Sequence, residues 1–166
     1  MVTKVSEVDT LVQKGINNPS SAFAEIKEMA DSEDWKIREV AATTLVEIGK
    51  KKPEETIKEM QKWVGSEDPN IRRASCEGLR NVGRITPEKV LTILEKLKTD
   101  DNLYVKKSVA SLLRNSTRRH PQFVLGLCQK WSSIHDKNTN WIIKDGLKKA
   151  KLTYPKEVEK IISSLK

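Results

Sequence analysis

Aromatic residues, glycine, proline and cysteine are all scarce in this chain of 166 residues. Only 5% of the residues are aromatic, with seven glycines and six prolines, while 37% are hydrophobic and 33% are charged. This composition suits a helical globular protein better than a β-sandwich or a disordered chain. A chain of this length is typical of one compact domain, so we expect a single domain over residues 1–166.

Long apolar runs are absent, which argues against a transmembrane helix or a signal peptide. The two cysteines, Cys76 and Cys128, lie on expected apolar helical faces and indicate buried free thiols in a reducing compartment. We therefore expect a cytoplasmic monomer that makes no contact with membranes.

Standard cofactor and nucleic-acid motifs are also absent. There is no zinc-finger spacing, RNP signature, P-loop or HExxH motif, and His120 and His135 are isolated. Neither cysteine has the histidine and acid that a nucleophile needs. No metal and no cofactor are expected.

Basic residues exceed acidic ones by 31 to 23, a formal net charge of +8. An excess of this size favours polyanionic partners such as nucleic acids. Stacking aromatics are scarce, so duplex DNA is a better candidate than RNA.

Proline recurs with a period of 34 residues, and the apolar residues after it keep the same step. The prolines are Pro19, Pro53, Pro87, Pro121 and Pro155. The clearest apolar registers are Ile26, Met60, Leu94, Cys128 and Ile162, then Met29, Trp63, Leu97 and Trp131, and, before the prolines, Leu11, Leu45, Leu79 and Leu113.

Each period predicts two helices. Proline suits the first turn of one helix, with Thr86 as the N-cap before Pro87. The partner helix has a 3.6-residue apolar period, and Gly49 and Gly83 are expected where it ends. The prediction is an all-α fold, an α-solenoid of about five two-helix repeats.

The second helix resembles that of a HEAT repeat, because a branched apolar residue and a cation follow an acidic turn. The pairs are Ile37-Arg38, Ile71-Arg72, Val105-Lys106 and, after a longer loop, Ile143-Lys144. The resemblance implies that these cations pair with an aspartate of a neighbouring repeat, for which Asp34, Asp68 and Asp101 are the candidates. Contact with a ligand is the alternative.

Further cations are harder to assign to repeat interfaces. Like charges 34 residues apart predict rows of cations along one side of the solenoid, which an extended polyanion would neutralise. For the cations at helix ends, a solvated surface on which they stabilise the helix dipole is an equally good explanation. The predicted DNA-binding residues are Arg72, Arg73, Arg80, Lys106, Lys107, Arg114, Arg118 and Arg119.

Four segments resemble the DNA alkylation repair glycosylases of the AlkC and AlkD type. They are DWKIREVAATTL (34–45), IRRASCEGLR (71–80), YVKKSVASLLRNSTRRHP (104–121) and NTNWIIKDGLKKA (138–150). The resemblance implies duplex DNA held by a HEAT-like solenoid and excision of cationic bases such as 3-methyladenine and 7-methylguanine.

The resemblance also implies roles for three residues. Glu39 would stabilise the oxocarbenium-like sugar and place a water, Trp35 would rest against sugar or base, and Glu77 would complete the second site segment with Arg80. A solvated or ion-paired glutamate and a tryptophan at a repeat interface remain the structural alternatives.

The chain departs from the family pattern at three places. The family has a tryptophan near Ile85 or Ser111 and an acid at Asn115. A second interpretation therefore stays open, in which the chain is a non-catalytic HEAT scaffold that binds an acidic protein or peptide.

Overall fold

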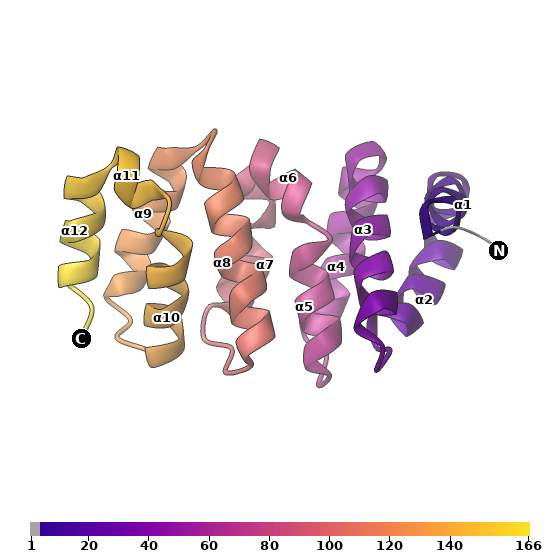
Figure 1. Cartoon of the computed structure of the whole chain (residues 1–166), viewed down its shortest axis with the longest axis horizontal. Coiled ribbons are helices and arrows are strands. Elements are labelled where there is room, and N and C mark those ends of the chain that lie inside the picture. The colour runs from indigo at the N-terminus through magenta and orange to yellow at the C-terminus, as the bar shows by residue number, and fades with distance from the viewer. Residues whose placement is uncertain (1–3) are drawn as a thin grey trace. The chain divides into compact units, whose positions relative to one another are not determined.

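The computed structural model describes residues 4–166, and within that range every element is helical. The chain divides into two compact units, the first ending at Val82 and the second beginning at Gly83. Figure 1 labels the helices of both units. The all-α prediction is confirmed, and within each unit helix pairs stack side by side as in an α-solenoid. The prediction of a single domain is not tested by this division.

In the first unit, helices that begin at the prolines Pro19 and Pro53 of the 34-residue period alternate with second helices that follow a polar turn capped by an aspartate. Its elements are α1 (Lys4–Asn17), α2 (Pro19–Ala30), α3 (Trp35–Lys51), α4 (Pro53–Trp63) and α5 (Pro69–Glu77). The following helix, α6 (Arg80–Ile85), contains the point where the units divide. Within the first unit α3 packs against α1, α2, α4 and α5.

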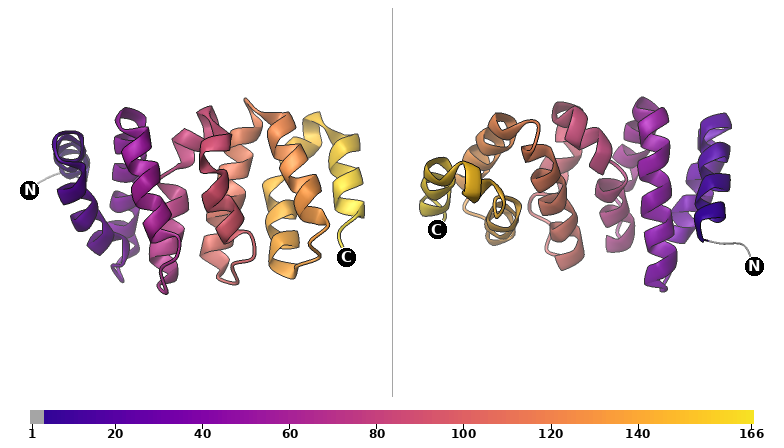
Figure 2. Two further views of the ribbon diagram at one scale, coloured as in Figure 1. Left: turned by 180° about the vertical axis from the view of Figure 1, so that it is seen from behind. Right: turned by 45° about the horizontal axis from the view of Figure 1, so that its top comes forward.

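The second unit repeats the alternation. Its elements are the 3₁₀ helix η1 (Pro87–Val90), α7 (Leu91–Leu97), α8 (Leu103–Thr117), α9 (Pro121–Ser132), α10 (Lys137–Gly146), α11 (Ala150–Thr153) and α12 (Pro155–Ser163). Here α10 packs against both α8 and α9. Figure 2 shows the pairing of neighbouring helices within each unit from two further directions.

The prolines begin a helix in each repeat, as predicted, and the second helices begin with equal regularity. A polar side chain accepts hydrogen bonds from the first backbone N–H groups at four positions spaced by 34 residues: Asp34, Asp68, Asn102 and Asp136. Such N-caps satisfy donors that the helix leaves without partners. The aspartates are therefore helix caps.

Two details of the predicted repeat are wrong. The fourth second helix has no longer loop, because its cap at Asp136 keeps the period. Thr139-Asn140 therefore occupies the register of the branched residue and cation, and Ile143-Lys144 lies one turn later. Thr86 occupies the N-cap position of η1, but its side chain makes no capping hydrogen bond.

The glycines expected at helix ends lie inside helices instead. Gly49 is within α3 and Gly83 is within α6, both are buried, and no glycine in residues 4–166 has a positive φ. A Cβ at Gly83 would lie 2.8 Å from Cδ2 of Leu112. These glycines permit close packing between helices and do not terminate them.

Two other glycines explain why some second helices are interrupted. The second helix is interrupted after Glu77, between α5 and α6, and after Gly146, between α10 and α11. In contrast, α3 and α8 are continuous helices. Gly78 and Gly146 are 68 residues apart, two periods, and the uninterrupted helices have Thr44 and Leu112 at this register. Glycine destabilises the interior of a helix, which explains why the second helices are interrupted at Gly78 and Gly146.

The same glycines allow close contact with the preceding second helix. A Cβ at Gly78 would lie 2.8 Å from Cβ of Leu45 on α3, and a Cβ at Gly146 would lie 3.1 Å from Cδ1 of Leu113 on α8. Leu45 and Leu113 are themselves 68 residues apart. Each unit therefore contains one copy of the same glycine-on-leucine contact.

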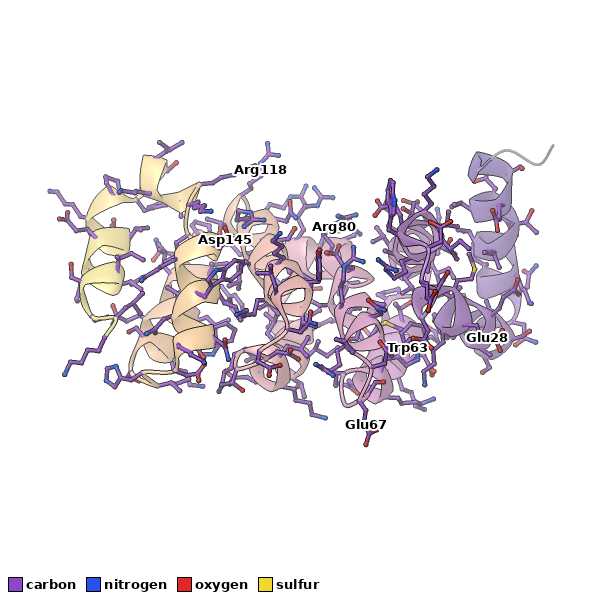
Figure 3. All side chains as sticks on the ribbon, turned by 60° about the horizontal axis from the view of Figure 1, so that its bottom comes forward. Glu28, Trp63, Glu67, Arg80, Arg118 and Asp145 are labelled. Atoms are coloured by element: carbon purple, nitrogen blue, oxygen red, sulfur yellow. The ribbon has the colours of Figure 1, made fainter. Side chains whose placement is uncertain are left out.

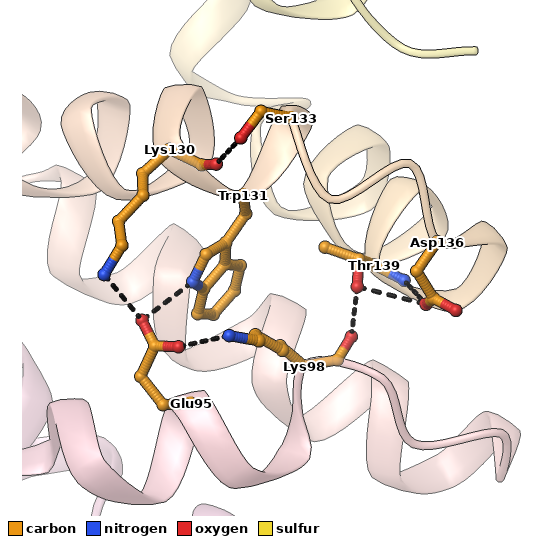
Figure 4. Close-up of polar contacts among 7 residues, drawn as sticks. All are labelled: Glu95, Lys98, Lys130, Trp131, Ser133, Asp136 and Thr139. Carbon is orange, nitrogen blue, oxygen red and sulfur yellow. Dashed lines mark hydrogen bonds and ion pairs between the residues drawn. The ribbon is translucent and has the colours of Figure 1, made fainter.

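Two buried tryptophans on the helices that begin at a proline donate hydrogen bonds to glutamates. Trp63 and Trp131 are almost fully buried, and Trp131 Nε1 donates to Glu95 Oε1 at 3.0 Å. Glu95 also pairs with Lys98 and with Lys130, whose Nζ lies 3.6 Å away (Figure 4). Burial opposes ionisation of this carboxyl, but its bonds to Lys98 and Trp131 lower its pKa overall. Glu95 thus links α7 to α9.

Replacing Gly78 by alanine is expected to destabilise the protein by about 1–3 kcal/mol, because the added methyl group would lie too close to the Leu45 side chain and to the Ala74 carbonyl oxygen. The matched control is Gly126→Ala inside α9, where nothing lies within 4 Å of the added Cβ. That change should stabilise the helix by about 0.5–1 kcal/mol. Urea denaturation followed by circular dichroism measures both; equal effects of the two substitutions would contradict the close contact.

Candidate functional site

Five predicted site residues gather in the first unit, on the second helices α3 and α5 and at the start of α6. Trp35 is the first residue of α3 and is 63% exposed. Glu39 lies one turn later on the same helix and is also exposed, so both side chains face solvent side by side. Neither side chain is buried in an interface between repeats.

Glu77 is the most enclosed carboxylate of this group, with its side chain 15% exposed. Burial raises the pKa of Glu77, the nearby Arg80 and Arg73 lower it in part, and the charge of Glu39 raises it further, with a net rise. Arg80 on α6, Arg73 on α5 and Glu39 on α3 thus all act electrostatically on Glu77, and Trp35 lies one turn from Glu39 on α3. We call Trp35, Glu39, Arg73, Glu77 and Arg80 the carboxylate cluster.

Arg80 is only loosely held by Glu77. Its Nη1 lies 3.5 Å from Glu77 Oε2, beyond the distance of about 2.7–2.9 Å typical of a charge-assisted hydrogen bond. The Arg80 side chain is 44% exposed. This guanidinium can therefore turn to an external anion at little cost.

The first cation of each repeat has an internal role. Nη1 of Arg72 donates to the carbonyls of Ser66 and Glu67 at 3.0 and 2.9 Å, and Arg38 makes the same two bonds to Ser32 and Glu33. The arginines thus close the turn before their own helix.

In the second unit the equivalent cation links two repeats. Nζ of Lys106 donates to Asn138 Oδ1 at 3.0 Å and lies 5.5 Å from the centre of the Trp141 ring. Lys107 is exposed and lies 5.5 Å from the Tyr104 ring, a cation–π contact that leaves its charge in solvent. Of this pair, Lys107 is the one available to a partner.

Arg114 is firmly held by a residue that the sequence interpretation missed. Its Nη1 lies 2.6 Å from Asp145 Oδ2 and 3.1 Å from the Asp145 carbonyl, and Lys148 contacts the same carboxylate at 2.6 Å. Burial opposes ionisation of Asp145, but the bonds from Lys148 and Arg114 lower its pKa overall. The available signal was the spacing, since Asp145 follows Glu77 by two periods.

The structure places two of the positions at which the sequence departs from the pattern of the glycosylases it resembles. Asn115 donates its side-chain amide to the Ser111 carbonyl at 2.9 Å, within its own helix. Ile85 is 44% exposed.

Arg118 and Arg119 are the exposed cations at the end of α8. Neither has an ion-pair or side-chain hydrogen-bond partner within the described part of the chain. Figure 3 shows Arg118 extending away from the ribbon, and it labels Arg80 and Asp145. Arg118 and Arg119 therefore stay available to an anion.

Metal-binding side chains do not gather anywhere in residues 4–166, where no three of His, Cys, Asp and Glu form a candidate site. None of the helices described is both long enough and apolar enough to cross a lipid bilayer.

Glu77 predicts a specific pH dependence of stability. Because its pKa is raised above 4.5 in the folded chain, the folded state takes up this proton more readily than the unfolded state. The contribution of Glu77 to the free energy of unfolding should therefore rise as pH falls through the raised pKa toward 4.5. The difference between wild type and Glu77→Gln, measured by urea denaturation at several pH values, isolates this group. A difference that stays constant, or that favours Glu77→Gln increasingly as pH falls, would contradict the burial of an ionisable carboxyl.

Comparisons with known proteins agree with this architecture. Residues 23–114, more than half of the chain, match the family model of HEAT repeats. A comparison with curated proteins found no match.

Solved structures share the fold at low sequence identity. The chain is similar to the alkylpurine DNA glycosylase AlkC of Pseudomonas fluorescens, bound to DNA containing an abasic site analog, with a TM-score of 0.80 and 23% identity. The match covers 96% of this chain and 45% of AlkC, so the chain spans less than half of that protein. AlkD2 from Streptococcus mutans matches with a TM-score of 0.70 and 24% identity, over 85% of this chain and 70% of AlkD2.

A third structure, smu.31 from Streptococcus mutans UA159, has a TM-score of 0.67 and 25% identity, over 78% of this chain and 67% of its own. The chain belongs to the HEAT-repeat family, with a fold similar to those of AlkC and AlkD2.

Proposed function

We propose that this protein binds duplex DNA and excises cationic alkylated purines such as 3-methyladenine and 7-methylguanine. The observation that carries the proposal is the carboxylate cluster, in which an exposed acid, one turn from an exposed tryptophan, and two arginines act by their charges on a second, largely enclosed acid. The likeness to AlkC, whose structure contains DNA with an abasic site analog, supports it.

The arginines supply the affinity. Duplex DNA carries about one negative charge per 1.7 Å of helix axis, and each phosphate neutralised by a cation releases counterions. Arg73 and the loosely paired Arg80 would make such contacts, whereas Arg114 is held by Asp145. The phosphates would be gripped without any reading of bases.

The carboxylates supply the chemistry. A purine alkylated at nitrogen already carries positive charge, so it leaves without an added acid. The remaining need is an anion beside the oxocarbenium-like sugar and a placed water, which Glu39 can provide from its exposed position. Trp35, one turn away, offers a flat apolar surface against the sugar or base.

Glu77 would act through its neighbours. Burial and the charge of Glu39 raise the pKa of Glu77, so the charged form of this carboxyl is less favoured than that of a solvated acid. Protonation of Glu77 would also leave Arg73 and Arg80 with their full charge for phosphates. In this scheme Glu77 is a positioning residue and Glu39 the catalytic one.

A non-catalytic scaffold for an acidic protein or peptide is the second candidate. The amide of Asn115 at the family's acid position favours it, because no carboxylate is available there. The exposed Lys107, Arg118 and Arg119 would be the contact residues.

Release of free bases from methylated duplex DNA distinguishes the two. Wild type should release 3-methyladenine or 7-methylguanine, and Glu39→Gln should lower the rate by about 100-fold or more while duplex binding persists. Glu55→Gln, an exposed acid on α4, is the control with the same charge change and should act as wild type.

Loss of release in Glu77→Gln with full release by Glu39→Gln would move the catalytic role to Glu77. No release by wild type would reject base excision and leave the scaffold.

A further inference from the structure

The second unit contains a pocket that the carboxylate cluster does not use. It lies between the end of α8 and the segment around α11, with a volume of about 370 Å³. This is within the range of about 300–1,000 Å³ that small-molecule sites occupy. The lining residues are Arg114, Thr117, Arg118, Lys149, Ala150, Thr153 and Tyr154.

The pocket is basic, and two of its cations are not neutralised. Arg118 and Lys149 are exposed and have no ion-pair or hydrogen-bond partner for their side chains among residues 4–166. Arg114 contributes its guanidinium to the wall, but Asp145 balances that charge at 2.6 Å. The pocket therefore presents two unbalanced positive charges.

Hydroxyl groups supplement the cations. The Thr117 hydroxyl donates its proton to the Leu113 carbonyl at 2.8 Å and is not free to donate to an anion. Thr153 and Tyr154 make no side-chain hydrogen bond within the described chain, so both can donate. The Tyr154 ring and Ala150 add apolar surface to the same wall. An oxyanion attached to an organic group suits this lining.

We propose that this pocket binds a phosphomonoester group, as carried by a mononucleotide or by the 5′-phosphorylated end of a DNA strand. A monoester carries a charge of about −1.5 to −2 at pH 7, which matches the two unbalanced cations. An internal phosphodiester carries a single charge and leaves one cation unsatisfied. Arginine presents a planar fork to phosphate oxygens, and lysine adds a point charge. The assignment does not depend on base excision, because none of the carboxylate cluster lines the pocket.

The probe is thymidine 5′-monophosphate, with thymidine as the ligand that lacks only the phosphate. Binding is measured by NMR chemical-shift titration or calorimetry on the full chain. Wild type should bind the monophosphate saturably and thymidine far more weakly. Arg118→Gln and Lys149→Gln should each weaken monophosphate binding about tenfold or more.

Lys160→Gln is the matched control. Lys160 on α12 is exposed and loses the same charge as Lys149→Gln, but it does not line the pocket. The affinity of this variant for the monophosphate should equal that of wild type. Absence of monophosphate binding, equal binding of thymidine, or equal losses in Lys149→Gln and Lys160→Gln would each overturn the proposal.

A second comparison assigns the source of the phosphate. If a 5′-phosphorylated duplex binds more tightly than the same duplex with 5′-hydroxyl ends, and Arg118→Gln removes that difference, the ligand is a DNA end. If the mononucleotide binds and the two duplexes do not differ, the ligand is a free nucleotide; both results support a phosphomonoester pocket. Failure of the hydroxyl-ended duplex to bind bears only on the proposed DNA function.

Discussion

Each helix pair in this chain has an apolar face that it can bury only against the next pair, and in each unit one such contact is made over a glycine. A Cβ at Gly78 would lie 2.8 Å from Cβ of Leu45, too close without a shift of the backbone, and one at Gly146 would lie 3.1 Å from Cδ1 of Leu113, which would have to move by a few tenths of an ångström. An acid directly precedes each glycine, Glu77 in one unit and Asp145 in the other. The requirement for close packing therefore also brings these carboxylates toward the neighbouring second helix and reduces their contact with water.

The two acids differ because their neighbours differ. Asp145 receives close contacts from Arg114 and Lys148, both at 2.6 Å, which hold it ionised and restrict Arg114. Burial raises the pKa of Glu77, the charge of Glu39 adds to the rise and the longer contact with Arg80 offsets it only in part, whereas the close contacts of Asp145 lower its pKa overall. One unit consequently has arginines that can turn to an anion, and the other has an internal ion pair at the same register.

The sequence was enough to predict the fold because proline and apolar residues recur at a fixed step that only stacked helix pairs explain. The fourth repeat was placed wrongly because the prediction sought a cation, whereas the cap at Asp136 keeps the period and Asn140 takes the cation's place.

Burial and charge pairing were harder to predict, because they depend on contacts between repeats. The 34-residue spacing predicted the same DNA-binding role for Arg80 and Arg114. Only the structure shows that Arg114 forms an ion pair with Asp145. The pocket beside Arg118 was missed because Lys149, Thr153 and Tyr154 form no motif of their own.

The salt dependence of duplex DNA binding tests the central claim, that Arg73 and Arg80 are available to phosphates. The logarithm of the association constant should fall linearly with the logarithm of salt concentration, by about 0.9 per phosphate contact. The double substitution Arg73→Gln with Arg80→Gln should reduce that slope by about 2, whereas Lys58→Gln on α4 should leave it unchanged. Binding without salt dependence, or an equal effect of Lys58→Gln, would contradict the account.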